Sequence, residues 1–541
     1  MSKGKLEKIG YSTHVFIYIL IVLVIIIAIN VISLAKFSRL DMTEDKRFSI
    51  SETTKNIARD LDDLINIKVY FTKNLPPQLV DLQHNVQDML DEYKAYARGN
   101  LQVEFIDPAS DPELEQRMQF IGIPKVMLNV FEKDKAQVAN VYLGMSVLYE
   151  DRKEAIPVIQ NIDNLEYDLT SAILKVIRKE PKVVGFLTGH GERPLEDDYS
   201  NIKKMLEKQY EIREVDLKKD KEALEKIDTL IIAGAEKVSD RHKYLLDQYL
   251  MGGGKEIFLI DTVKLGEEGG LSANNVETDL LDMLRHYGVT IKSDLVLDRS
   301  NSRAAFSGGG FFHFQLPYPF WPKVRKDGFN KEQPMVSELE SLTLPWTSSL
   351  KIEQASIERQ GVSATILAKT TPHGWTQQGR YDLNPQQNFG LTAAGSREEI
   401  PLAVMLSGKF KSFYANKKIP PKEEEDSDKE STADESALKE NHEDVQIIAI
   451  GNSRFIKDDF LGRFRENSIF FMNMVDWLTM GDKLIGIRSR ETVDRPLKEI
   501  SSSQMATIRY INIFGISILI IIFGLVRVYL KRKRRSYVYE F

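Results

Sequence analysis

The run KVVGFLTGHGE at residues 182–192 decides how the largest part of this chain folds. Residues 183–188 are apolar or small and do not alternate with polar residues, which predicts a strand buried on both faces of a sheet. A glycine-rich turn follows, and the amphipathic stretch at 199–210 predicts a helix. A buried strand followed by a helix is the unit from which parallel α/β sheets are built.

The same alternation continues toward the C-terminus. Further strands are predicted at 212–217, 229–233, 256–261, 363–369, 402–407 and 445–450, and further helices at 240–250 and 467–477. Gly252, Gly253 and Gly254 stand where a helix must stop and the chain reverse, a position that favours a positive φ. They follow a helix and do not match GxxxxGK[ST], so they are not a phosphate-binding loop. The predicted fold class is α/β, with a mostly parallel sheet covered on both faces.

Two segments interrupt this pattern. Residues 262–345 are rich in Gly, Pro, Ser and aromatic residues, and we expect long ordered loops around a sheet edge. Residues 422–444 hold eleven acidic residues against three lysines, with almost no apolar side chain, which predicts a disordered acidic insertion in a surface loop. A calcium site there would need a turn glycine, and the stretch has none.

The N-terminal part predicts a smaller α/β domain. A strand at 65–71, a helix at 79–93 and a strand at 101–107 form a βαβ unit. A helix at 113–121, strands near 126–131 and 138–149, and a helix at 163–178 follow. Residues 50–155 therefore have a thioredoxin-like outline, although the redox centre of that fold is impossible in a chain with 0 Cys.

Two apolar runs predict membrane anchors: the first has no charged residue, and the second has only Arg509 and Arg527, one near each end. Residues 12–35 and residues 508–528 are each long enough to cross a bilayer as a helix. A cleaved signal peptide ending at Ser33-Leu34-Ala35 is the alternative for the first run. Lysines precede the first run, and a basic cluster at 531–535 follows the second, so both termini are expected in the cytoplasm. We therefore predict a protein of the inner membrane whose large central region is periplasmic, with a basic tail that also suits anionic lipid.

The predicted organisation is a set of segments, in chain order. They are a cytoplasmic tail at 1–11, a membrane helix at 12–35, an N-terminal α/β domain at 36–160, a main α/β domain at 161–421 and 445–490, the acidic insertion at 422–444, a linker at 491–507, a membrane helix at 508–528 and a basic tail at 529–541.

Composition excludes several classes of function. The 541 residues, 42% of them hydrophobic, are too many for one ordinary domain and too apolar for general disorder. The net charge of −6 combines basic tails with an acidic body, which argues against a nucleic-acid partner. The absence of Cys excludes thiolate nucleophiles and thiolate metal sites.

The turn Gly189-His190-Gly191-Glu192 is the candidate ligand site, because open α/β sheets bind ligands beyond the carboxyl ends of their strands. His190 and Glu192 together supply too few ligands for zinc, so no metal or cofactor is predicted. The alternative is a tight turn whose glycines supply positive φ and whose polar side chains bond to the backbone. The pair Asp197-Asp198 suits a solvated surface better than acid–base chemistry.

No catalytic constellation is visible elsewhere. The chain has no GxSxG, HExxH or Walker A sequence, so ATP energy would have to come from another polypeptide. Four aromatic residues in the 262–345 segment suit either a carbohydrate or protein docking surface, or packing against the core: Phe311, Phe312, Tyr318 and Trp321.

Several segments together resemble the gliding-motility-type ABC-transporter auxiliary proteins, the GldG-like family. They are RLDMTEDKRFSISETTKNIARDL, VEFIDPASDPELEQRMQFIGIP, LEYDLTSAILKVIRKEPKVVGFLTGHGE, LDQYLMGGGKEIFLID, AIGNSRFIKDDFL and NSIFFMNMVDWLT. The residues that mark these motifs are Gly189, His190, Gly191, Glu192, Gly253, Asp261, Asn452 and Trp477, and none is carried over as catalytic. The acidic insertion departs from the family pattern.

The resemblance implies an extracytoplasmic module, similar in part to glutamine-amidotransferase and intraflagellar-transport folds but without catalytic machinery. It implies a place beside an ABC-2-type permease served by a separate ATPase. We therefore expect a non-enzymatic auxiliary subunit whose external region gates, receives polysaccharide or protein cargo, or transmits ATP-driven motion. The alternatives are an envelope glycan-binding scaffold and an envelope hydrolase that uses the Gly189–Glu192 turn.

Overall fold

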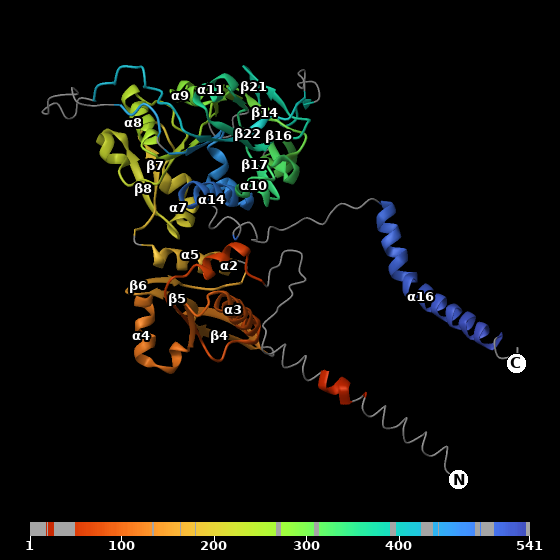
Figure 1. Ribbon diagram of the computed structural model, residues 1–541. Coiled ribbons are helices and arrows are strands. Elements are labelled where there is room, and N and C mark those ends of the chain that lie inside the picture. The colour runs from red at the N-terminus through yellow and green to blue at the C-terminus, as the bar shows by residue number, and fades with distance from the viewer. Residues whose placement is uncertain are drawn as a thin grey trace, which may run out of the picture. The chain divides into compact units, whose positions relative to one another are not determined.

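The structure is a computed structural model with two compact units, residues 1–491 and 492–541. It describes residues 18, 20–25, 49–132, 135–162, 164–178, 180–266, 272–307, 313–389, 397–422, 437–441, 443–481, 487 and 502–536. Figure 1 shows the chain and labels many of its helices and strands. The chain is a mixed α/β protein with parallel and antiparallel sheets.

The N-terminal part of the first unit is built around a four-stranded sheet with the order β2-β1-β5-β6. Its elements are α2 (Glu52–Arg59), β1 (Ile65–Phe71), α3 (Pro77–Tyr96), β2 (Leu101–Ile106), α4 (Pro112–Ile121), β3 (Val126–Glu132), β4 (Lys135–Val141), β5 (Leu143–Tyr149), β6 (Arg152–Ile156) and α5 (Leu165–Ile177). The parallel pairing of β1 with β2 across α3 confirms the predicted βαβ unit. Strands β3 and β4 form a separate antiparallel hairpin.

A buried polar cluster joins the start of α2 to α5. Ser51 caps α2 by accepting a hydrogen bond from the Thr54 amide at 3.1 Å. The Glu166 carboxylate in turn accepts from the Ser51 amide and from the Thr54 hydroxyl, each at 2.6 Å. The polar start of this segment is therefore a helix cap that is held by the Glu166 carboxylate, 115 residues further along the chain.

The main sheet has seven strands in the order β19-β22-β23-β10-β9-β7-β8. The strands are β7 (Val183–Thr188), β8 (Glu211–Asp216), β9 (Thr229–Ala233), β10 (Lys255–Leu259), β19 (Ser363–Lys369), β22 (Pro401–Gly408) and β23 (Val445–Ile450). Strands β8, β7, β9, β10 and β23 are parallel, and β22 and β19 join antiparallel. The prediction of a mostly parallel sheet is confirmed.

Helices cover both faces of this sheet, as predicted. On one face, α8 (Asp240–Met251) shares a buried cluster with Phe258 and Ile260 through Tyr244 and Leu246. On the other face, Thr229 of β9 meets Thr479 of α14 (Arg465–Met480), with their hydroxyls 3.0 Å apart. Because successive strand residues point to opposite faces, α8 and α14 lie on opposite sides of the sheet.

The turn after α8 is made by three glycines with different tasks. Gly252 caps the helix with an ordinary φ of −77°, and Gly253 adopts the positive φ of 97°. A Cβ on Gly254 would lie 2.4 Å from the ring of Tyr249, so only glycine allows that ring to rest on the backbone. The predicted turn is confirmed, with the positive φ at one position.

The expectation of loops over residues 262–345 is wrong. The described part of this segment forms short elements: β11 (Val263–Leu265), β12 (Ser272–Asn275), α9 (Leu281–Tyr287), β13 (Val289–Ile291), β14 (Leu295–Leu297), β15 (Asn301–Ser307), β16 (His313–Arg325), α10 (Pro334–Ser337) and β17 (Ser341–Thr343). Strand β16 contains Pro317, Pro319 and Pro322, which lack the N–H that a central strand needs. Strand β17 pairs with it only at Lys323–Arg325, beyond these prolines.

The second unit contains α16 (Ser502–Ser536). Among the described residues no single helix is long and apolar enough to span a membrane. The segments Ser503–Ile516 and Ile518–Leu530 meet the test as a pair bent by 42°. The first predicted anchor at 12–35 falls outside the described residues except for helical residues 18 and 20–25, and most of the predicted insertion at 422–444 also falls outside them.

Candidate functional site

The Gly189–Glu192 turn lies at the point where the strand order of the main sheet reverses. Strands β8, β9, β10 and β23 lead away from β7 in both directions, and β7 and β9 are neighbours. Their carboxyl ends are where sheets of this order place ligands. Gly189 and Gly191 have φ values of 98° and 95°, which a residue with a side chain rarely adopts. The sequence prediction for the place and the backbone of this turn is confirmed.

The chain itself closes the crevice between these two strands. The carbonyl of His190 accepts hydrogen bonds from the amides of Glu236 at 2.9 Å and Lys237 at 3.2 Å. A Cβ on Gly191 would lie 3.4 Å from Cβ of Glu236, so the two loops are in van der Waals contact. The turn is thus held against the loop after β9 by hydrogen bonds within the chain itself.

A buried chain of three polar side chains runs through the turn. Nε2 of His190 lies 2.7 Å from Nδ1 of His242 on α8, and Nδ1 of His190 lies 3.3 Å from Oε1 of Glu192. The other carboxylate oxygen of Glu192 accepts from the His190 amide at 2.6 Å. The side chains of His190 and Glu192 are each 4% exposed.

This arrangement has the order of a proton relay, but Nδ1 of His190 and Oε1 of Glu192 form no hydrogen bond within the described residues, and both side chains are buried. A carboxylate that orients an imidazole, which in turn contacts a second base, is a known catalytic pattern. A substrate would have to reach one of these groups, and among the described residues only Glu192 of the three lines a cavity, whose volume of about 180 Å³ is small for a ligand site. The contact between His190 and His242 joins the turn after β7 to α8. Within the described ranges, no group of three His, Asp or Glu residues is arranged to hold a metal ion.

Asp261 and Asn452 follow the carboxyl ends of the neighbouring strands β10 and β23. The Asp261 carboxylate accepts hydrogen bonds from the Ser453 amide at 3.0 Å and from the Ser453 hydroxyl at 2.5 Å. Nη1 of Arg454 lies 3.4 Å from Oδ1 of the same carboxylate. Asn452 donates to the carbonyl of Pro345 and accepts from the Phe455 amide at 2.8 Å. These motif residues fix the loop after β23, so their role in the structure is to hold neighbouring strand ends together.

A segment from the inserted elements covers the same edge. The Ser348 amide donates to the carbonyl of Gly451 at 2.8 Å, and its hydroxyl lies 2.7 Å from that of Thr262. A Cβ on Gly451 would lie 2.4 Å from the Ser348 carbonyl oxygen, so glycine is required there. Trp346, just before, has a positive φ of 53°. The space beyond β10 and β23 is therefore filled by the chain.

A small cavity of about 180 Å³ remains beside β7. It is lined by Thr188, Glu192, Arg193, Tyr199 and Glu214 among others. Its volume is below the range of about 300 to 1,000 Å³ typical of small-molecule sites. The carboxyl edge thus offers little room for a substrate.

The remaining candidate residues are spread through the fold. Tyr318 and Trp321 are 1% and 4% exposed and belong to an aromatic core cluster, which agrees with the packing alternative for these two residues. Phe311 and Phe312 lie outside the described residues. Gly253 is at the opposite, amino edge of the sheet, and Trp477 is half-buried on α14.

Sequence reasoning missed His242. It lies in the first turns of the helix after β9, and its partner is 52 residues away. The position of His242 in the sequence could have indicated it. Helix α8 follows β9, the neighbour of β7, so a polar residue near the start of α8 lies close to the carboxyl edge of the sheet. The pattern of the helix alone did not reveal it, because His242 is buried among apolar neighbours of α8.

Two sequence families match this chain. A family described as an ABC-type uncharacterized transport system matches residues 181–479, more than half of the chain. A domain of unknown function matches residues 44–148. An uncharacterized protein of Borreliella burgdorferi is 25% identical over 507 residues, which cover 92% of this chain and 94% of the relative.

Solved structures are similar to this chain at low TM-scores. The N-terminal domain of mmIFT52 is 17% identical with a TM-score of 0.34, covering 55% of this chain and 98% of that domain. A thua-like protein from Bacteroides uniformis is 12% identical with a TM-score of 0.29, covering 56% of this chain and 93% of that protein.

Proposed function

The chain belongs to the ABC transporter auxiliary family, and from this premise we propose that it is a non-enzymatic subunit of an ABC transport complex. We propose that two membrane helices, near residues 12–35 and 508–528, hold it in the inner membrane with both termini in the cytoplasm. The region between them then lies in the periplasm. The finer assignment to the gliding-motility-type branch, beside an ABC-2-type permease and a separate ATPase, belongs to this proposal.

The family match over residues 181–479 is the observation that carries this proposal. The sequence supports the division of labour, because without a Walker A motif the energy of ATP must come from another chain. The apolar helical pair Ser503–Leu530 and the basic cluster after it support the anchor and its orientation.

The proposed mechanism is mechanical. Movement of the permease and ATPase would reach the external region through the membrane helices, and that region would gate, receive or follow the cargo. A rigid sheet whose strand ends are tied by the His190 and Asp261 contacts suits transmission of motion as one body.

The hydrolase alternative lacks a supporting observation, because the groups it would use are 4% exposed. The glycan-binding alternative relied on the aromatic residues Phe311, Phe312, Tyr318 and Trp321. Of these, Tyr318 and Trp321 are buried, and Phe311 and Phe312 lie outside the described residues, so no observation supports this alternative. We therefore propose no second function.

Copurification tests the proposal. The tagged full chain, extracted in mild detergent, should bring with it a permease and an ATPase. A matched chain that lacks residues 508–541 should lose both partners, because the second helix is the proposed contact within the membrane. Recovery of the full chain as a solitary stable oligomer would contradict the proposal.

A further inference from the structure

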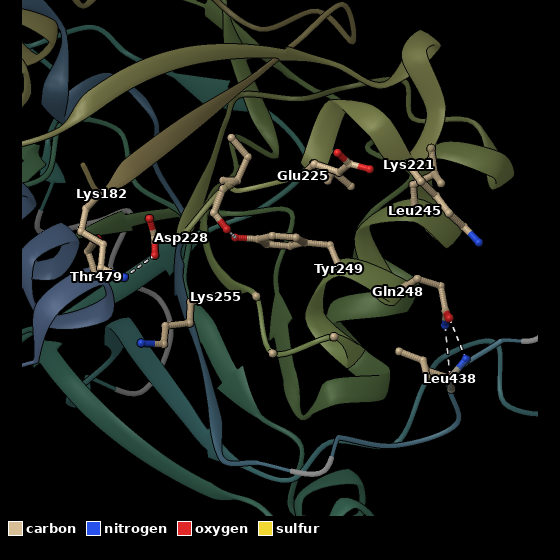
Figure 2. A pocket seen from close by; sticks show the side chains of 15 residues that line it. Lys182, Lys221, Glu225, Asp228, Leu245, Gln248, Tyr249, Lys255, Leu438 and Thr479 are labelled. Atoms are coloured by element: carbon tan, nitrogen blue, oxygen red, sulfur yellow. Dashed lines mark hydrogen bonds and ion pairs between the residues drawn. The ribbon is translucent and has the colours of Figure 1, made fainter. Parts of the chain in front are cut away.

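A cavity of about 550 Å³ opens at the amino edge of the main sheet, opposite the site described above (Figure 2). Lys182, Asp228 and Lys255, which line it, stand at the first positions of β7, β9 and β10 or directly before them. The end of α8 and the turn Gly252–Gly254 form another part of the wall. Its volume is in the range typical of small-molecule sites.

The charges at one end of this cavity are unbalanced. Nζ of Lys182 lies 2.6 Å from Oδ1 of Asp228, whose other oxygen accepts from the Val183 amide at 2.8 Å. Both carboxylate oxygens of Asp228 thus already have a partner. Nζ of Lys255 donates to the carbonyl of Leu478 at 2.5 Å, and within the described part of the chain no carboxylate lies within 4.0 Å of it.

Lys255 is therefore a half-buried ammonium beside a second ammonium. Burial and the Lys182 charge lower the pKa of Lys255 below its ordinary value. Figure 2 shows the ends of both lysines on the same side of the cavity. An oxyanion placed between them would offset the desolvation of the charge and would use the donors that Lys255 has left.

The other part of the wall is apolar and fixed in place. The ring of Tyr249 rests on Gly254, and its hydroxyl donates to the Ile227 carbonyl at 3.3 Å. Leu224 and Leu245 are buried side chains on the same wall. In Figure 2 the ring lies between the Lys182 and Lys255 end and Leu245. A flat apolar body would find an ordered surface there without rearrangement of the ring.

We propose that this cavity binds a small organic anion, in which a phosphate or carboxylate group contacts Lys255 and Lys182 and an apolar body rests on Tyr249. The site is independent of the transporter assignment, because it uses only contacts within the main α/β region. It also lies at the edge of the sheet that the chain leaves open, whereas the carboxyl edge is filled.

Calorimetric titration of the full chain in detergent tests this site. Phenyl phosphate and phenylacetate are the two probes, and they distinguish a phosphate from a carboxylate ligand. Inorganic phosphate and benzyl alcohol, which carry only the anion or only the ring, should each bind at least tenfold more weakly than the better probe, a difference of about 1.4 kcal/mol. Equal binding of benzyl alcohol would overturn the proposal.

The variants locate the binding. Lys255→Gln should weaken the better probe about tenfold, and Lys255→Arg should retain most of the affinity. Lys351→Gln is the matched control, because Lys351 is an exposed lysine paired with Glu353 at 3.1 Å, away from this cavity. Leu438→Trp, at a 44% exposed lining position, should obstruct the cavity without removing a charge or a core residue.

The proposal fails if neither probe binds saturably up to about 10 mM, a concentration that would detect even millimolar affinity. It also fails if Lys255→Gln and Lys351→Gln have the same effect. If Lys255→Gln does not fold, Leu438→Trp decides: unchanged affinity in that variant places the binding elsewhere.

Discussion

His190 and His242 meet edge to face, with Nε2 of the first 2.7 Å from Nδ1 of the second and the ring planes at 81°. One ring must donate and the other accept, so at least one of the two imidazoles is neutral while the bond exists. The contact ties the turn after β7 to the helix after β9. Because β7 and β9 are neighbours at the point where the strand order reverses, this contact spans that point of the sheet.

Replacement of His190 should therefore reduce stability. His190→Ala removes the bond to His242 and leaves a buried ring nitrogen without this partner, at a cost of about 2 kcal/mol. Thermal unfolding of the purified full chain measures the loss. His84→Ala, at an exposed histidine of α3, should change the midpoint little. An enzymatic activity that disappears in His190→Ala at unchanged stability would instead favour the hydrolase alternative.

The parallel strands of the main sheet were predictable because their residues are apolar without interruption. Strand β9 was expected at 229–233 and spans Thr229–Ala233, and β23 was expected at 445–450 and spans Val445–Ile450. The helix expected at 199–210 is α7 (Ser200–Glu207), which is shorter than predicted, and a separate short helix, α6 (Leu195–Asp198), precedes it. Local pattern fixes the type of an element better than its ends.

Contacts between distant segments were not predictable in this way. Glu256 is predicted from the sequence as a polar residue at the start of a strand. It is 0% exposed, however, and neither of its carboxylate oxygens has a hydrogen-bond partner among the described residues. Burial and nearby Asp247 raise its pKa well above the ordinary value. Only the central place of β10, covered by α8, makes this burial evident. The amino-edge cavity was missed for the same reason, since Lys182, Asp228 and Lys255 come from three separate segments of the chain.

Asp476 should make stability depend on pH. It is buried on α14 and accepts from the Tyr210 hydroxyl at 2.6 Å, and burial raises its pKa from 3.8 to about 7. Its protonated form stabilises the fold. This contribution is fully present below the unfolded pKa of 3.8 and is lost as the pH rises through about 7. Ionisation of Asp476 alone should make the free energy of unfolding about 2 kcal/mol lower at pH 8.5 than at pH 5.5.

Asp476→Asn isolates that contribution. The amide keeps an oxygen that can accept from Tyr210 but cannot ionise, so the variant should lose the part of the pH dependence that belongs to Asp476. Unfolding midpoints across this pH range, measured side by side with the unaltered chain, give the comparison. Parallel pH profiles for the two proteins would show that Asp476 does not titrate in this window.

The three glycines after α8 should respond differently to alanine. Gly252→Ala should change stability by less than about 0.5 kcal/mol, because its φ is ordinary and the nearest atom is 3.4 Å away. Gly253→Ala should cost about 1 kcal/mol through its positive φ alone. Gly254→Ala should cost about 2 to 3 kcal/mol, because its Cβ meets the Tyr249 ring at 2.4 Å. Equal unfolding midpoints for the three variants would contradict this account of the turn.

The proposed topology can be mapped with single cysteines, because the chain has none of its own and the unaltered protein gives no background. Ser110→Cys is at an exposed residue between β2 and α4, and Ser2→Cys and Ser536→Cys mark the two ends. If the central region is periplasmic, a membrane-impermeant maleimide added to cells with an opened outer envelope should label Ser110→Cys at once. The terminal cysteines should react only after the inner membrane is permeabilised, since the basic clusters near both apolar runs favour the cytoplasm. Labelling of the termini before permeabilisation, with Ser110→Cys protected, would reverse the orientation and remove the basis for an external subunit.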